Sequence, residues 1–118
     1  MMKYGGPLKE GSYLPRKVAN LKVDTHAFIA LLAPRTLFIT AGADDLWSDS
    51  KGAVISARGA TPVYELLGKK GLVMKDNNPA LNTVYDEGSI AFHYHEGAHV
   101  YSLQSLPVFV KLARSVFQ

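Results

Sequence analysis

The sequence predicts an α/β protein in which helices alternate with parallel strands. A β-branched and apolar run, residues 36–40, lies between Pro34 and Gly42, which is typical of a buried strand. A second run, residues 90–95, alternates as Ile-Ala-Phe-His-Tyr-His and predicts another strand. Segments with helical spacing precede, separate and follow these two strands, which is the order expected of a layered parallel sheet.

The chain before and between the strands carries helical signals. Asp24 or Thr25 is a candidate cap for a short first helix. Residues 53–67 have roughly helical spacing, but Gly59 and Pro62 interrupt it, and we therefore expect two short helices there.

The segment after these helices, residues 71–88, is rich in turn residues and predicts a surface connection with a turn of helix near Leu81. The last helix is the clearest element, because its apolar residues fall on one stripe and Ser105 is a plausible N-cap. The stripe consists of Leu106, Phe109, Val110, Ala113, Val116 and Phe117.

Residues 1–23 contain several glycines and prolines without periodicity and predict an irregular lead-in, whereas residues 24–118 predict one packing unit. Two parallel strands leave hydrogen-bonding groups and apolar surface exposed, because such a sheet needs neighbours on its edges and cover on both faces. We therefore expect an incomplete sheet whose remaining strands belong to sequence upstream of Met1.

The composition argues against several functions. The 13 Lys and Arg residues exceed the 10 Asp and Glu by only +3 and form no basic run, which disfavours nucleic-acid binding. The longest apolar stretch, residues 27–34, is too short to span a membrane. The absence of cysteine excludes disulfides and thiolate nucleophiles but leaves the cellular compartment open.

The loops that follow the two strands carry candidate catalytic residues. Working residues of open parallel sheets lie beyond the carboxyl ends of the strands, and here Asp45 follows the first strand while His99 follows the second. An acid that binds one imidazole nitrogen frees the other to accept a proton, so we expect the two side chains within hydrogen-bonding distance. The order of acid and then histidine matches that of α/β-hydrolases, in which the serine comes first.

That serine is not among these residues. The sequence has no Gly-x-Ser-x-Gly, and no serine stands in the strand-turn-helix setting of a nucleophile elbow. No candidate oxyanion loop is present either. The serines are Ser12, Ser48, Ser50, Ser56, Ser89, Ser102, Ser105 and Ser115.

Several motifs, in order from about Asp24 to Phe117, resemble the C-terminal third of glucuronoyl esterases, family fifteen of the carbohydrate esterases. The combination is far more specific than any single motif. The motifs are Asp24-Thr25-His26, Ala30-Leu31-Leu32-Ala33-Pro34-Arg35, Gly42-x-x-Asp45-x-Trp47-x-Asp49-x-x-Gly52, Pro62-Val63-Tyr64-x-Leu66-Leu67-Gly68 and Phe92-His93-x-x-Glu96-Gly97-Ala98-His99.

The resemblance implies an α/β-hydrolase fold and hydrolysis of esters between the 4-O-methyl-glucuronoyl groups of xylan and lignin alcohols. His99 falls on the family's catalytic histidine, Asp45 on the acid that many bacterial members use, and Trp47 on a tryptophan that lines the sugar pocket. The resemblance further implies no cofactor, a secreted or periplasmic location, and a need for the N-terminal part of the hydrolase domain.

The sequence also departs from the family. Ala98 replaces the second of two glycines before the histidine, a change that can crowd this turn. Ser105-Leu106 replaces an Asp-Trp pair at the start of the last helix. The family's serine and the basic residue beside it match no position here.

Other interpretations of these residues remain open. Asp45 can simply cap the next helix, as can Asp44 or Asp49. Trp47 can be a packing residue, in which case it is buried.

The histidines allow a metal site as an alternative, since His93 and His95 lie on one face of a strand with Glu96 and His99 close in sequence. Nothing supplies a further ligand with recognisable spacing, so we expect no metal, and at least one of His93 and His95 buried and hydrogen-bonded. A further hypothesis is a non-catalytic product of a truncated or split gene, which packs against something else or is unstable.

Overall fold

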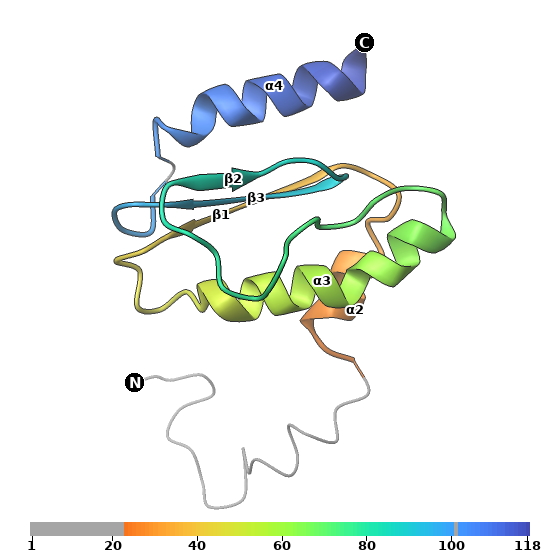
Figure 1. Ribbon diagram of the computed structural model, residues 1–118, viewed down its shortest axis with the longest axis horizontal. Helices are drawn as coiled ribbons and strands as arrows, with labels where there is room; N and C mark the ends of the chain where they lie inside the picture. Colours follow the sequence, from red (N-terminus) through yellow and green to blue (C-terminus); the bar gives the residue numbers. More distant parts are fainter. Residues whose placement is uncertain (1–22, 101) are drawn as a thin grey trace, which may run out of the picture.

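Figure 1 shows three layers, in which α4 covers one face of a small sheet while α2 and α3 cover the other. The computed structural model describes residues 23–100 and 102–118, so all of the predicted lead-in except Val23 lies outside the described residues. No helix in these two ranges is both long and apolar enough to cross a membrane. The elements are α2 (Thr25–Ala30), β1 (Leu37–Gly42), α3 (Ser50–Leu66), β2 (Thr83–Tyr85), β3 (Ile90–His95) and α4 (Ser105–Phe117).

The sheet has the order β1-β3-β2. β1 and β3 are parallel neighbours, with a register that runs from Leu37 opposite Ile90 to Gly42 opposite His95. The two predicted strands and their direction are thus confirmed. β2 pairs with β3 in the antiparallel direction. No turn of helix forms near Leu81, since Leu81 and Asn82 lie in a turn instead. The sequence also missed β2, whose β-branched and aromatic residues follow this turn.

The main core lies between the sheet and α3. Residues of β1, β3 and α3 meet here with little or no exposed surface, and Ile29 and Ala30 of α2 pack at its edge. The buried residues of this core are Ala41, Val54, Ala57, Ala60, Tyr64, Leu72, Ile90 and Phe92.

α3 is one continuous helix, so the expectation of two short helices is wrong. Pro62 removes one N–H donor, but the helix continues because Tyr64 is fully buried beyond it and donates its hydroxyl to the carbonyl of Arg35 at 2.8 Å. Gly59 is needed for packing, since a Cβ there would lie 3.0 Å from the Cβ of His26 in α2. Tertiary contacts thus outweigh both interruptions of the helical pattern.

α2 and α3 begin at the expected acids. Asp24 accepts a hydrogen bond from the N–H of Thr25 at 2.7 Å, and Asp49 accepts one from the N–H of Gly52 at 2.8 Å. Asp49 is thus the N-cap of α3, which is one of the interpretations given above for this residue.

α4 has the predicted extent, but its apolar stripe is largely exposed. Leu106 and Phe109 keep 56% and 53% of their surface, and Phe117 keeps 87%. Phe109 reaches the sheet, where its ring lies 6.4 Å from that of Phe38. Ser105 is not the cap: Gln104 holds that position, and Ser105 is the buried first residue of the helix.

Candidate active site

The parallel pairing of β1 and β3 brings the loops after both strands to one edge of the sheet. Gly42 and His95, the last residues of the two strands, lie opposite each other. The backbone pairing continues past them, because the N–H of Ala43 donates to the carbonyl of His95 at 2.8 Å and that of Asp44 donates to Gly97 at 2.9 Å. The segment that carries Asp45 is therefore tied to the segment that carries His99.

Asp45 and His99 meet at this edge. The Nδ1 of His99 lies 2.5 Å from Oδ2 of Asp45, although the residues are 54 positions apart. The two side chains are therefore within hydrogen-bonding distance, as expected from the sequence. Since an ionised carboxylate only accepts hydrogen bonds, Nδ1 of His99 donates and Nε2 is left free to accept a proton.

Asp45 is held in place by its own turn as well. Its side chain is 4% exposed, and Oδ1 accepts hydrogen bonds from the N–H groups of Trp47 and Ser48 at 3.1 and 3.2 Å. Burial raises the pKa of the Asp45 carboxyl, but the hydrogen bonds from His99, Trp47 and Ser48 outweigh burial, so this pKa lies below its ordinary value of 3.8. Asp45 is therefore an anion at neutral pH.

The turn before His99 depends on two glycines. A Cβ on Gly42 would lie 2.4 Å from the carbonyl oxygens of both Gly97 and Ala98, so only glycine lets the two segments approach this closely. Gly97 has a φ of 99°, which favours glycine. Ala98 is exposed and does not carry the positive φ, so the side chain that replaces the family's second glycine does not crowd the turn.

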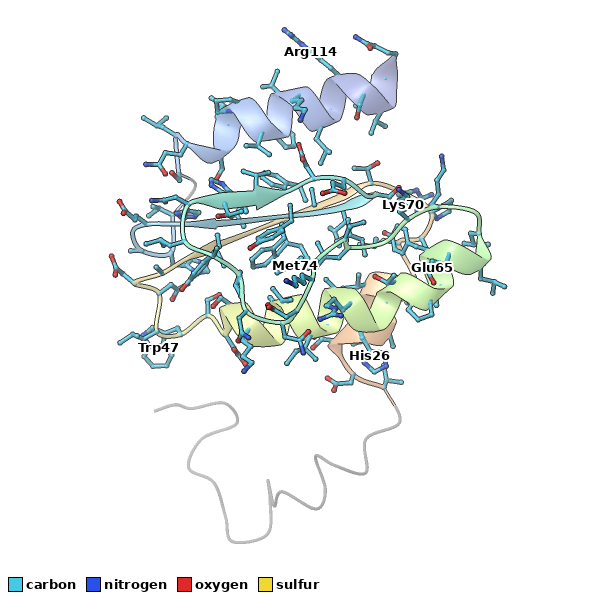
Figure 2. All side chains as sticks on the ribbon, in the orientation of Figure 1. His26, Trp47, Glu65, Lys70, Met74 and Arg114 are labelled. Carbon is cyan, nitrogen blue, oxygen red and sulfur yellow. The ribbon has the colours of Figure 1, made fainter. Side chains whose placement is uncertain are left out.

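His99 and Trp47 are both open to solvent. The His99 side chain is 86% exposed, and Trp47 is 98% exposed. Figure 2 shows Trp47 at the outer edge of the molecule, on the side where the carboxyl ends of β1 and β3 lie. The packing interpretation requires a buried indole, and the described residues do not bury it.

His93 and His95 are both buried on β3, as expected for at least one of them. Nδ1 of His93 lies 2.7 Å from the hydroxyl oxygen of Ser105, and Nδ1 of His95 lies 2.7 Å from the carbonyl oxygen of Glu96. In the described part of the chain, no three His, Asp or Glu side chains are grouped so that they could hold a metal ion.

Two surface depressions lie away from Asp45 and His99. One, of about 610 Å³, is lined by α4 and the Gln118 that follows it, and the other, of about 350 Å³, lies near the amino ends of β1 and β3. Neither is lined by Asp45, Trp47 or His99.

Sequence reasoning missed two contacts that shape this edge. Asn82, with a φ of 56°, accepts a hydrogen bond from the N–H of Glu96 at 3.1 Å, and Ser105 contacts His93. Asparagine tolerates positive φ better than most residues, so Asn82 next to a β-branched run was a usable signal for a turn into a strand. No local pattern indicates the contact of Ser105, which joins a helix to a strand.

Comparisons with known proteins agree on one family. The family model described as "Glucuronyl esterase, fungi" matches residues 9–68, about half of the chain. A carbohydrate esterase from an unknown prokaryotic organism is 34% identical over 97 residues, which is 82% of this chain and 22% of that protein.

Solved structures give the same result. A CE15 glucuronoyl esterase from Teredinibacter turnerae matches with a TM-score of 0.78 and 33% identity over 88% of this chain and 24% of its own. A glucuronoyl esterase from Solibacter usitatus matches with a TM-score of 0.71 and 35% identity over 78% of this chain and 23% of its own.

The chain thus spans about a quarter of the length of these relatives. Its three-stranded sheet with flanking helices is an incomplete α/β-hydrolase sheet. The chain belongs to the glucuronoyl esterase family of the carbohydrate esterases, and its fold is that of the α/β-hydrolases.

Proposed function

We propose that this chain forms the C-terminal part of a serine esterase, in which His99 is the general base, Asp45 orients it, and an upstream segment supplies the nucleophilic serine. One observation carries the proposal: the 2.5 Å hydrogen bond between His99 and Asp45 at the edge where the carboxyl ends of β1 and β3 meet. Open α/β sheets hold their reacting residues at this edge.

The hydrogen bond suits proton transfer by His99. With Nδ1 donating to Asp45, Nε2 accepts the serine proton as the hydroxyl attacks the ester carbonyl. The same nitrogen then returns the proton to the departing alcohol. Asp45 remains ionised throughout and stabilises the imidazolium, a role that its lowered pKa supports.

The substrate class follows from family membership together with the exposed indole. The substrates are esters of 4-O-methyl-glucuronoyl groups of xylan with lignin alcohols, or related uronate esters. Trp47 is two residues beyond Asp45 and offers a rigid apolar ring to solvent, which suits contact with a sugar ring. No residue of the chain matches the serine, so the upstream part of the hydrolase domain is required for turnover.

Activity measurements on two proteins test this proposal. The 118-residue chain alone should not hydrolyse a benzyl glucuronate ester above the buffer rate. A chimera in which this chain replaces the C-terminal quarter of the Teredinibacter turnerae enzyme should hydrolyse it. In the chimera, His99→Ala should lower kcat by roughly 10²–10⁴-fold, the usual contribution of a general base.

His26→Ala is the matched control, because His26 is an exposed histidine of α2 and plays no part in the proposed chemistry. Turnover by the isolated chain that His99→Ala abolishes would reveal a nucleophile within these residues. An active chimera that keeps its kcat after His99→Ala would refute the role of His99.

A non-catalytic role is the second candidate, and the exposed apolar stripe of α4 favours it. Such a chain would pack against another protein without taking part in hydrolysis. A folded chimera without esterase activity would support this candidate over the first.

A further inference from the structure

The face of the sheet that lies under α4 contains two buried imidazoles that the proposed proton transfer does not use. His93 is 4% exposed and His95 is 1% exposed, and both belong to β3. Their ring centroids are 5.4 Å apart. Burying two imidazoles is costly unless their nitrogens are hydrogen-bonded, so the partners of these rings indicate what the residues do.

His95 holds the start of the segment that carries His99. Its Nδ1 donates to the carbonyl oxygen of Glu96 at 2.7 Å, since a carbonyl only accepts. The N–H of Glu96 donates in turn to Asn82 at 3.1 Å. The backbone of Glu96 is thus fixed on both sides at the point where the chain leaves β3.

His93 holds the other end of the same segment. Its Nδ1 lies 2.7 Å from the hydroxyl oxygen of Ser105, which is 4% exposed and is the first residue of α4. His93 and His95 are two positions apart on β3 and point to the same face of the sheet. Their contacts with Ser105 and Glu96 therefore lie at the two ends of residues 96–104.

Among the described residues, the side chain of His99 has one hydrogen-bond partner. Its side chain is 86% exposed, and the hydrogen bond to Asp45 is the side-chain contact that the structure shows for it. An exposed side chain is not restrained by packing, so its rotamer and position depend on where the backbone places its Cα. The backbone is placed by the hydrogen bond from the N–H of Asp44 to the carbonyl of Gly97 and by the contacts at the two ends of the segment.

We propose that His93 and His95 are positioning residues, which fix both ends of residues 96–104 and so keep Nδ1 of His99 on the carboxylate of Asp45. The catalytic consequence of this arrangement rests on the proposed function, whereas the arrangement itself does not. Neither imidazole contacts the reacting atoms. A purely structural role would instead make these residues part of the packing under α4, without effect on His99.

The tautomer of His99 distinguishes the two roles. The ¹⁵N shifts of an imidazole show which nitrogen carries the proton, and they also show when both nitrogens do, so the ratio is read at an alkaline pH where the shifts themselves report a neutral ring. In the wild-type chain, His99 should be mostly the Nδ1–H tautomer. Ser105→Ala should lower the ratio of Nδ1–H to Nε2–H roughly fivefold, the ratio that corresponds to ~1 kcal/mol, the net value of one hydrogen bond.

Replacements at the histidines sharpen the test. His93→Leu and His95→Leu fill most of the space but cannot hydrogen-bond, so both should move His99 in the same direction as Ser105→Ala. His93→Asn keeps a polar atom near the place of Nδ1 and should restore most of the wild-type ratio.

Thr61→Ala is the matched control. It removes the two hydrogen bonds of the Thr61 hydroxyl, which accepts from the N–H of Leu72 at 3.1 Å and donates to the carbonyl of Ala57 at 3.3 Å, on the opposite face of the sheet. It should lower the melting temperature by a similar amount and leave the tautomer of His99 unchanged.

The proposal is overturned if wild-type His99 is mostly Nε2–H, or if Ser105→Ala destabilises the chain as Thr61→Ala does without changing the ratio. If the leucine variants fail to fold, Ser105→Ala and His93→Asn still decide between these outcomes. Failure of the proposed function would show separately, as a folded chimera that does not hydrolyse the ester while the isolated chain keeps the Nδ1–H tautomer.

Discussion

The two faces of the sheet differ in how completely they are covered. On the α3 face, Val54, Ala57, Ala60 and Tyr64 of the helix are fully buried. On the α4 face, the apolar residues of the helix are mostly exposed, and the sheet offers two imidazoles where the other face offers Ile90 and Phe92.

The difference in burial indicates a different role for each face of the sheet. The α3 face is the buried apolar core of the described residues, and apolar burial favours folding. The α4 face holds polar contacts that place residues 96–104, and its helix keeps an apolar stripe available for further packing. The buried apolar core thus lies on the α3 face of the sheet, and the contacts that place residues 96–104 lie on the α4 face.

The largest predicted effect compares one phenylalanine from each face. Phe92→Ala should cost about 3–5 kcal/mol, because this fully buried ring leaves a cavity in the α3 core. Phe109→Ala should cost only about 1 kcal/mol, since that ring is half exposed. Urea titration measures both changes in the free energy of unfolding, provided that its dependence on urea concentration has the same slope in the variants and the wild type. Equal losses would show that α4 is packed as fully as α3.

A smaller effect is expected at Gly42, where the backbones of β1 and the His99 turn meet. Gly42→Ala should cost about 1–3 kcal/mol, because the added Cβ cannot fit against the carbonyls of Gly97 and Ala98. The turn must move, and the Nδ1–H tautomer of His99 should decline with it. Gly68→Ala is the control: it strains a positive φ in open space, so it should destabilise the chain without changing His99.

A residue on each face should also make stability depend on pH, His93 on the α4 face at acid pH and Tyr64 on the α3 face at alkaline pH. Burial, with a contribution from the charge of His95, lowers the pKa of His93 below 6.5, so the unfolded chain binds the proton more tightly. The free energy of unfolding should therefore fall as the pH drops below 6.5. Burial raises the pKa of Tyr64 above 10.0, so stability should also fall as the pH rises above 10.0.

Urea titrations across this pH range measure both effects. His93→Asn should remove the fall that begins below pH 6.5 but not the fall below pH 3.8 that Asp45 causes, and Tyr64→Phe should remove the alkaline fall alone. An acid side that is unchanged in His93→Asn would contradict the assignment to the α4 face.

The smallest effect on stability is predicted for Trp47, which belongs to neither face. Trp47→Ala should change the free energy of unfolding by less than about 0.5 kcal/mol, because the indole is 98% exposed. In the chimera it should raise KM for the uronate ester and leave kcat largely unchanged. Leu46→Ala, at a neighbouring residue that is 95% exposed, should change neither. An unchanged KM in Trp47→Ala would refute the sugar-binding role.

Local sequence patterns predicted the elements whose residues act mainly through local contacts. β1, β3 and α4 follow from apolar runs and from helical spacing. Local sequence patterns gave the wrong element where tertiary contacts determine the secondary structure. The three residues of β2 become a strand only by pairing with β3, and Pro62 stays inside α3 because Tyr64 beyond it is buried.

The same distinction holds at the site. Asp45 and His99 could be paired from sequence, because parallel strands bring their carboxyl ends to one edge. The contact between His93 and Ser105 could not, since it depends on where α4 lies over the sheet. The exposure of Trp47 likewise follows from the path of its loop and not from its residue type.

The two oxygens of Asp45 have separate partners, Oδ2 with His99 and Oδ1 with two N–H groups of the turn that follows it. The turn therefore keeps the carboxylate in place whether or not the imidazole changes its charge. In water, creating a positive ring requires the surrounding dipoles to reorient, and this reorganisation is a large part of the barrier to charge formation. In the proposed mechanism the negative charge already stands beside the ring, so a turn of four residues would supply the electric field before any proton moves.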